Sequence, residues 1–180
     1  RMRDQWASVP ERLIPELTQN DRLDQIDFVD NNMEARVRTR FDGYSVLDTL
    51  TDNYLHCTLT TRTSVEMRLL PTGDSTCVVA VVHTAKAPVA VSTVRFYDTK
   101  WMPAEVTLVV PDVEQFADSL DDQLLRALAD LPLVEESLSA ESTDMRLTIS
   151  AAPFSRDTRH ALEGKLHPVI LHWNEEKSCY

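Results

Sequence analysis

Alternation of apolar and polar residues is clearest in the middle of the chain. The segments 55–59 and 65–69 place apolar side chains at every second position, which is typical of antiparallel strands with one buried face. The continuous apolar run at 77–82 indicates a central strand covered on both faces. Further strands are expected at 89–97 and 105–110. The pattern therefore predicts about five consecutive strands.

Turn residues separate these segments. Pro71, Gly73 and Asp74 mark one reversal, and residues 86–88 supply the next. Such residues favour chain reversal because proline restricts the backbone torsion φ, glycine permits positive φ, and aspartate bonds to nearby backbone. Short connections between consecutive strands predict a meander.

The first 45 residues show helical signals instead. Ser8 followed by Glu11, with Pro10 in the first turn, predicts a short helix over 8–17 that Pro15 limits or kinks. A second helix is expected to begin at Asn20 or Asp21. It carries apolar residues at helical spacing and ends before a turn at residues 42–43.

After Pro111 the apolar period changes from two to about 3.6. The spacing of Val113, Phe116, Leu120, Leu124, Leu128 and Leu131 predicts one long amphipathic helix over 113–131. Four further elements are expected to follow: a weaker helix before Ser142, a strand at 145–149, a short helix at 155–163 closed by Gly164, and a final strand over 169–173. The tail at 174–180 is expected to fray.

These elements predict a single α+β domain over residues 1–180. We expect a helical part at 1–45, a sheet at 54–110, and a helix with the last strands at 112–173. The sheet is antiparallel and meander-like, with about six to eight strands. The N-terminal helices and the long amphipathic helix pack against it.

Charge limits the classes of partner. The 180 residues include 29 acidic and 18 basic ones, for a net charge of −11, which opposes binding to nucleic acid. The densest basic run, Arg36, Arg38 and Arg40, alternates with uncharged residues, and we interpret it as a solvated strand or helix end. No apolar run approaches the roughly 18 residues of a transmembrane helix.

Sequence motifs for chemistry are sparse. The three glycines stand alone, which excludes phosphate-binding glycine loops and the serine nucleophile elbow. Cys57, Cys77 and Cys179 are too few and too widely spaced for a disulfide scaffold or a zinc site. We expect two of these thiols to be buried, the third to be exposed, and neither a cofactor nor a metal ion to be bound.

The acidic series Asp21, Asp24, Asp27 and Asp30 has two interpretations. A three-residue step rotates a helix position by about 300°, so the four side chains spread around the helix, which favours capping and solvation. The alternative is a functional pair, Asp27 with Asp30. Five histidines lack metal-binding spacing. His167 and His172, near the last strand, could meet a carboxylate, but the ordinary interpretation as strand-edge histidines is favoured.

Three aromatic residues surround one predicted turn. Phe96, Tyr97 and Trp101 flank Asp98 and Thr99. Aromatic side chains beside a turn can form a platform for a peptide or glycan, or they can cover the core. We take Phe96, Tyr97, Asp98 and Trp101 as the candidate contact surface.

The chain resembles a Bacteroidales family of exported proteins, domain of unknown function 3256. The likeness covers about the first 100 residues, departs at 41–43 and 85–91, and is weaker in the last third. The family brings no activity, but it implies a signal peptide upstream of Arg1 and residence outside the cytoplasm. The motifs that carry the resemblance are Met2-Arg3-Asp4, Pro10, Ile14-Pro15, Leu17-Thr18, Asn20-Asp21-Arg22-Leu23-Asp24, Ile26-Asp27-Phe28-Val29-Asp30, Met33, Leu69-Leu70-Pro71, Asp74-Ser75, Phe96-Tyr97-Asp98-Thr99, Trp101 and Pro103.

The sequence therefore favours an exported, non-catalytic binding or structural protein of the cell envelope. Its partner is expected to be a protein, peptide or glycan. Two alternatives stay open: a carrier of a lipophilic ligand, and a metal-dependent hydrolase that uses Asp27 and Asp30 with a C-terminal histidine. An apolar cavity between sheet and helix would favour the carrier, and carboxylates converging with His167 or His172 would favour the hydrolase.

Overall fold

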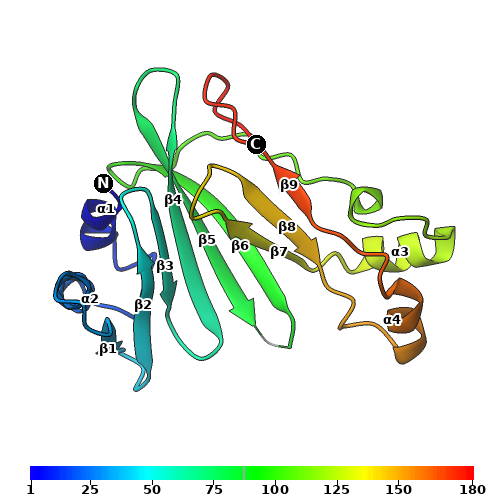
Figure 1. The fold of residues 1–180 in the computed structure, drawn as a ribbon, viewed down its shortest axis with the longest axis horizontal. Coiled ribbons are helices and arrows are strands. Elements are labelled where there is room, and N and C mark those ends of the chain that lie inside the picture. Colours follow the sequence, from blue (N-terminus) through cyan, green and yellow to red (C-terminus); the bar gives the residue numbers. More distant parts are fainter. Residues whose placement is uncertain (87) are drawn as a thin grey trace.

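The computed structural model describes residues 1–86 and 88–180, and they form an α+β fold with two antiparallel sheets (Figure 1). The first sheet has six strands in chain order, β1 (Arg36–Arg38), β2 (Tyr44–Leu50), β3 (Tyr54–Thr58), β4 (Thr63–Pro71), β5 (Cys77–Lys86) and β6 (Ala90–Asp98). The second has three, β7 (Val134–Leu138), β8 (Met145–Ile149) and β9 (Val169–Leu171). The predicted meander-like antiparallel arrangement is confirmed.

The helices are short, and the longest, α2, has 12 residues. They are α1 (Met2–Ser8), α2 (Gln19–Asp30), the 3₁₀ turn η1 (Val113–Phe116), α3 (Asp122–Asp130) and α4 (Arg156–Leu162). As predicted, α4 is a short helix followed by Gly164, whose φ of 71° is a backbone conformation that glycine adopts without strain.

Each face of the six-stranded sheet has a different cover. Side chains of α1 and α2, including Trp6 and Ile26, pack with Leu55, Met67 and Val79 on one face. On the other face, residues of β7, β8 and β9 pack over Leu70, Ala80 and other side chains. In Figure 1, α1 and α2 accordingly lie on the opposite side of the first sheet from the second sheet. Apolar burial on both faces explains the continuous apolar run in β5.

The N-terminal helix differs from the prediction. It covers Met2–Ser8 and ends where a helix was expected to begin, and the Ser8 hydroxyl bonds back to the carbonyl of Asp4. Residues 9–17 form an irregular segment in which Pro10 and Pro15 oppose helix formation. The buried guanidinium of Arg22 donates to the carbonyls of Trp6, Val9 and Leu17, which satisfies backbone groups that a helix would have paired.

Several sheet predictions also need correction. The first sheet begins at Arg36, so β1 and β2 lie partly within the segment expected to be helical. Residues 105–110 form no strand; they contact the chain terminus through a single bridge between Thr107 and Cys179. β7 stands where a weak helix was expected. The predicted reversal at 86–88 includes Ala87, which lies outside the described residues.

The predicted long helix over 113–131 is also wrong. It is split into η1 and α3 because Ala117 is extended and pairs with Leu166. The C-terminal tail, expected to fray, is docked instead. The Tyr180 ring packs against Trp173 at a centroid distance of 5.2 Å, and its hydroxyl donates to the carbonyl of Thr143.

The described helices include no candidate membrane span. Within residues 1–86 and 88–180, no helix combines the length and the apolar character that crossing a bilayer requires.

Candidate functional site

The predicted aromatic turn lies at the end of β6, and its aromatic rings pack against other residues of the protein. Successive strand residues point to opposite faces, so Phe96 lies near Tyr180 whereas Tyr97 lies near Trp101, at centroid distances of 6.3 and 5.8 Å. Tyr97 and Trp101 are buried in the core on the helix side. The structure thus brings together only two of the three aromatic rings.

The same turn holds the N-terminal segment in place. Oδ1 of Asp98 accepts from the backbone amides of Lys100 and Met102, and Trp101 has a φ of 65°. The indole of Trp101 donates to the Ser8 hydroxyl, and Arg12 donates to the carbonyl of Trp101. Thr99, Lys100 and Met102 are the exposed side chains of the turn. The role of the aromatic turn as a contact surface for a partner stays a prediction.

The carboxylates and histidines of the hydrolase hypothesis lie in different parts of the fold. Asp30 on α2 pairs with Arg3, and Asp27 is exposed on the same helix. His167 instead contacts Asp118, and His172 contacts Asp144. Both histidines therefore meet a carboxylate, the alternative that the sequence left open, but neither meets Asp27 or Asp30. The described residues contain no group of three or more side chains with the arrangement of a metal site.

His172 belongs to a small polar cluster beside the second sheet. Its Nδ1 lies 2.8 Å from Oδ1 of Asp144, and Oδ2 of Asp144 accepts from the Ser142 hydroxyl. These two hydrogen bonds lower the pKa of Asp144. In a nucleophilic triad, histidine stands between serine and the carboxylate. Here the carboxylate stands between them, so this cluster does not activate the serine.

The cysteines are free and their positions follow the predicted strand order. Cys57 lies on β3 and Cys77 on β5, with β4 between them. Cys57 is buried as expected, whereas Cys77 and Cys179 are both half-buried. Burial raises the pKa of Cys57 to about 12. Since the thiolate is the nucleophilic form, Cys57 is a structural residue.

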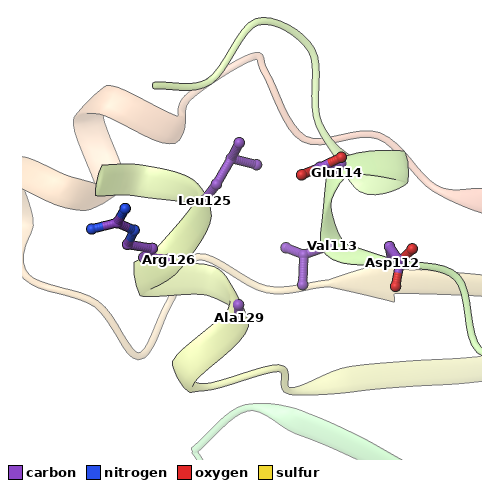
Figure 2. Close-up of a pocket in the computed structure, with 6 residues that line it drawn as sticks. All are labelled: Asp112, Val113, Glu114, Leu125, Arg126 and Ala129. Atoms are coloured by element: carbon purple, nitrogen blue, oxygen red, sulfur yellow. The ribbon is translucent and has the colours of Figure 1, made fainter. Parts of the chain in front are cut away.

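An open hollow separates η1 from α3 (Figure 2). It has a volume of about 320 Å³ and is lined by Asp112, Val113, Glu114, Leu125, Arg126 and Ala129. We call it the α3 groove. Figure 2 shows Val113 and Glu114 on one side of it, with Leu125 and Ala129 of α3 on the other. Because charged and apolar side chains share its lining, it lends no support to a carrier of lipophilic ligands.

The sheet itself leaves one face uncovered, on β1, β2 and the end of β3. Val37 and Leu47 point towards the helices, so the alternating neighbours point the opposite way. β7 crosses β4, β5 and β6 but does not extend over β1 and β2. We call the resulting surface the outer-strand face. It consists of Arg36, Arg38, Tyr44, Val46 and Thr58, with the carboxylate of Asp48 bonded to the Thr58 hydroxyl beside them.

A cation–π pair stands at the centre of the outer-strand face. The guanidinium of Arg36 lies 4.1 Å from the ring centroid of Tyr44, and Tyr44 is 55% exposed. Among the described residues, no carboxylate forms an ion pair with Arg36, whereas Arg38 pairs with Asp42. Phe41, in the turn between β1 and β2, is 67% exposed. The sequence predicted Arg36 and Arg38 to be solvated residues of a strand or helix end and gave them no functional role; both are exposed residues of β1.

Comparisons with known proteins identify the family but no activity. The chain is similar to a solved structure described as "Structure of a domain of an uncharacterized protein from Porphyromonas gingivalis W83". The two share 22% identity with a TM-score of 0.79, over 99% of this chain and 95% of the other, a likeness that shows the fold alone. No curated protein matches the chain. Residues 1–178 match the family described as "Protein of unknown function (DUF3256)", and the chain belongs to that family.

Proposed function

We propose that this protein is an exported, non-catalytic binding protein of the cell envelope, and that its outer-strand face contacts a partner protein. The observation that carries the proposal is the exposed pair of Arg36 and Tyr44 on an uncovered sheet face. The export half of the proposal rests on the resemblance to an exported family.

The composition of this face favours a protein partner. Arginine and aromatic residues are enriched among the side chains that dominate binding energy at protein interfaces. Stacking on Tyr44 holds the Arg36 guanidinium in place and leaves its edge free to donate to a carboxylate. Val46 and Phe41 add apolar surface nearby. A complementary partner would present a carboxylate beside an apolar patch.

Direct edge-to-edge association of two copies is disfavoured on this side. β1 is an edge strand of only three residues, and Arg36 and Arg38 flank its one apolar residue. Pairing two such strands would bring guanidinium groups together, and charged side chains on an edge strand oppose this kind of association. The partner is therefore a different protein.

The aromatic turn provides a secondary contact in this proposal. Asp98, Lys100 and Met102 form its accessible part, since Tyr97 and Trp101 are buried. We expect the aromatic turn to contribute less to binding than the outer-strand face. The buried rings of Tyr97 and Trp101 have little accessible surface that a partner could cover.

In-cell photo-crosslinking tests the proposal. The full-length gene, expressed in its native host, would carry a photoreactive phenylalanine analogue in place of Tyr44. A matched control would carry it at Ile170 on β9, which is also apolar and 43% exposed. We expect a discrete crosslinked adduct in the envelope fraction from position 44 and none from position 170. Adducts from position 170 alone, or a cytoplasmic protein without adducts, would overturn the proposal.

A further inference from the structure

The α3 groove lies in the most acidic part of the chain. Residues 105–130 contain seven acidic residues and one basic residue, Arg126. Asp112 and Glu114 stand on the η1 side of the groove and are exposed. In the described chain, neither carboxylate forms an ion pair, and the one pair within 105–130 joins Asp118 to His167. The two carboxylates on the η1 side of the groove therefore have no ion-pair partner among the described residues, and Arg126 is the one basic residue in the lining.

Apolar surface accompanies these carboxylates. Val113 and Leu125 are half-buried in the groove, with the exposed Ala129 beside them. Val109, immediately before η1, is 64% exposed, and Leu131, at the end of α3, is 41% exposed. Exposed apolar residues that gather in one region, rimmed by charge, are typical of a site for association.

We propose that the α3 groove binds a basic amphipathic segment of a partner protein. Apolar side chains of that segment would cover Val113 and Leu125, and its lysine or arginine side chains would lie against Asp112 and Glu114. The helix-in-groove mode of recognition needs this combination of an apolar floor and complementary charge. The overall charge of −11 also favours approach of a basic partner.

Other occupants fit the groove less well. A second copy of this chain would bring one acidic surface against another, at a cost in electrostatic energy. An anionic membrane would meet the same repulsion. This inference goes beyond the proposed contact at the outer-strand face, which lies at the opposite end of the fold from α3 (Figure 1).

A synthetic peptide provides the test. The probe is a fluorescent 18-residue helix of leucine and lysine with one apolar face, and its binding to the full chain is followed by fluorescence anisotropy. A peptide of identical composition with a scrambled order controls for charge alone. We expect the amphipathic peptide to bind and the scrambled peptide to bind at least about tenfold more weakly, because only the former presents a continuous apolar face.

Variants locate the binding site. Asp112→Lys with Glu114→Lys should weaken binding about tenfold or more, since two rim contacts become repulsive. Asp24→Lys with Asp27→Lys on α2 changes the net charge equally at exposed positions and should weaken binding less than about threefold. Ala129→Arg, at an exposed position, should also weaken binding because it fills the groove with positive charge.

Three results would overturn the inference. The first is no binding of the amphipathic peptide. The second is equal loss of binding in the two double variants, which would mean attraction to an acidic surface in general. The third is full binding by Ala129→Arg. Circular dichroism of each variant confirms that its fold is intact.

Discussion

At the scale of single residues, the contact between the two sheets depends on buried polar groups. β7 lies across the first sheet with its edge amides facing side chains there. Oε2 of Glu66 accepts from the amide of Leu138, and the Ser92 hydroxyl accepts from the amide of Glu136. Arg68 donates to two carbonyls in the turn after β7. These side chains form hydrogen bonds with backbone groups of β7 and the following turn that would otherwise be exposed or unpaired.

Glu136 is the residue of this contact whose burial is energetically unfavourable when its carboxyl group is ionised. Its side chain is buried, and its Oε2 has no hydrogen-bond partner among the described residues. Burial raises the pKa of Glu136 from its ordinary 4.5 to about 7. The group is therefore accommodated best in its neutral form, in contrast to most surface carboxylates.

This pKa predicts a pH dependence of folding stability. Below pH 4.5, Glu136 is protonated in both the folded and the unfolded chain, so its ionisation costs nothing. As pH rises from 4.5 to about 7, the unfolded chain loses this proton more readily than the folded chain, and the free energy of unfolding falls. The total loss is at most about 3.5 kcal/mol, at about 1.4 kcal/mol per pKa unit.

Glu136→Gln isolates the effect because it keeps the shape and removes the ionisation. The difference in unfolding free energy between variant and parent, measured in urea from pH 4.5 to pH 8, should grow in favour of the variant and level off above pH 7. Parallel profiles would contradict the burial of an ionisable Glu136.

At the scale of elements, the break between η1 and α3 shows how tertiary pairing overrides a helical pattern. Phe116 and Leu128 are buried, as their spacing predicts. Between them, Ala117 bridges Leu166, and the amide of Asp118 donates to the carbonyl of Lys165. These backbone bonds to a distant segment hold Ala117 extended, so a helix begins again only at Asp122.

Asp121 is the N-cap of α3, because its Oδ1 accepts from the amide of Leu124 at 2.8 Å. Asp121→Ala should therefore lower the free energy of unfolding by about 1 kcal/mol. Asp122→Ala, one residue later, removes the same charge without a cap and should cost less than about 0.5 kcal/mol. Urea unfolding of both variants measures the difference. Equal losses would mean that charge, and not the cap, stabilises the start of α3.

Local patterns were sufficient for some elements and insufficient for others. β3 to β6 and β8 were predictable because their alternating or continuous apolar residues reflect burial directly. β7 was not, since its burial arises from contact with Glu66 and Ser92, far away in the chain. Residues 105–110 alternate like a strand and are partly buried, but a strand also needs a neighbour, which an isolated segment does not reveal.

At the scale of the whole molecule, the covers of the first sheet are displaced from each other. α1 and α2 lie on one face and the second sheet on the other, and the second sheet is shifted towards β6. This displacement exposes the outer-strand face at one end, while α3 lies at the other (Figure 1). The basic alternation at Arg36 and Arg38 was visible in the sequence, but its exposure depends on where a distant sheet packs.

The three tryptophans report on the two sides of the first sheet. Trp6 and Trp101 belong to the core on the helix side, and Trp173 belongs to the core under the second sheet. Because both cores contain side chains of β3, β4, β5 and β6, we predict a single domain that unfolds in one cooperative transition.

Two variants test this prediction. Trp173→Phe leaves reporters on the helix side only, and the double variant Trp6→Phe with Trp101→Phe leaves a reporter on the other side only. Within each variant, the urea transition by fluorescence should coincide with the transition by far-ultraviolet circular dichroism. Separate transitions in either variant would indicate two independently folding units.

We propose that this family member contacts partner proteins through two surfaces at opposite ends of the fold, the outer-strand face and the α3 groove. In-cell photo-crosslinking from position 44 and from position 129, in separate strains, tests it most directly. The account predicts a discrete adduct from each position, with a different partner at each end. Folded protein in the envelope that yields no adduct from either position would contradict it.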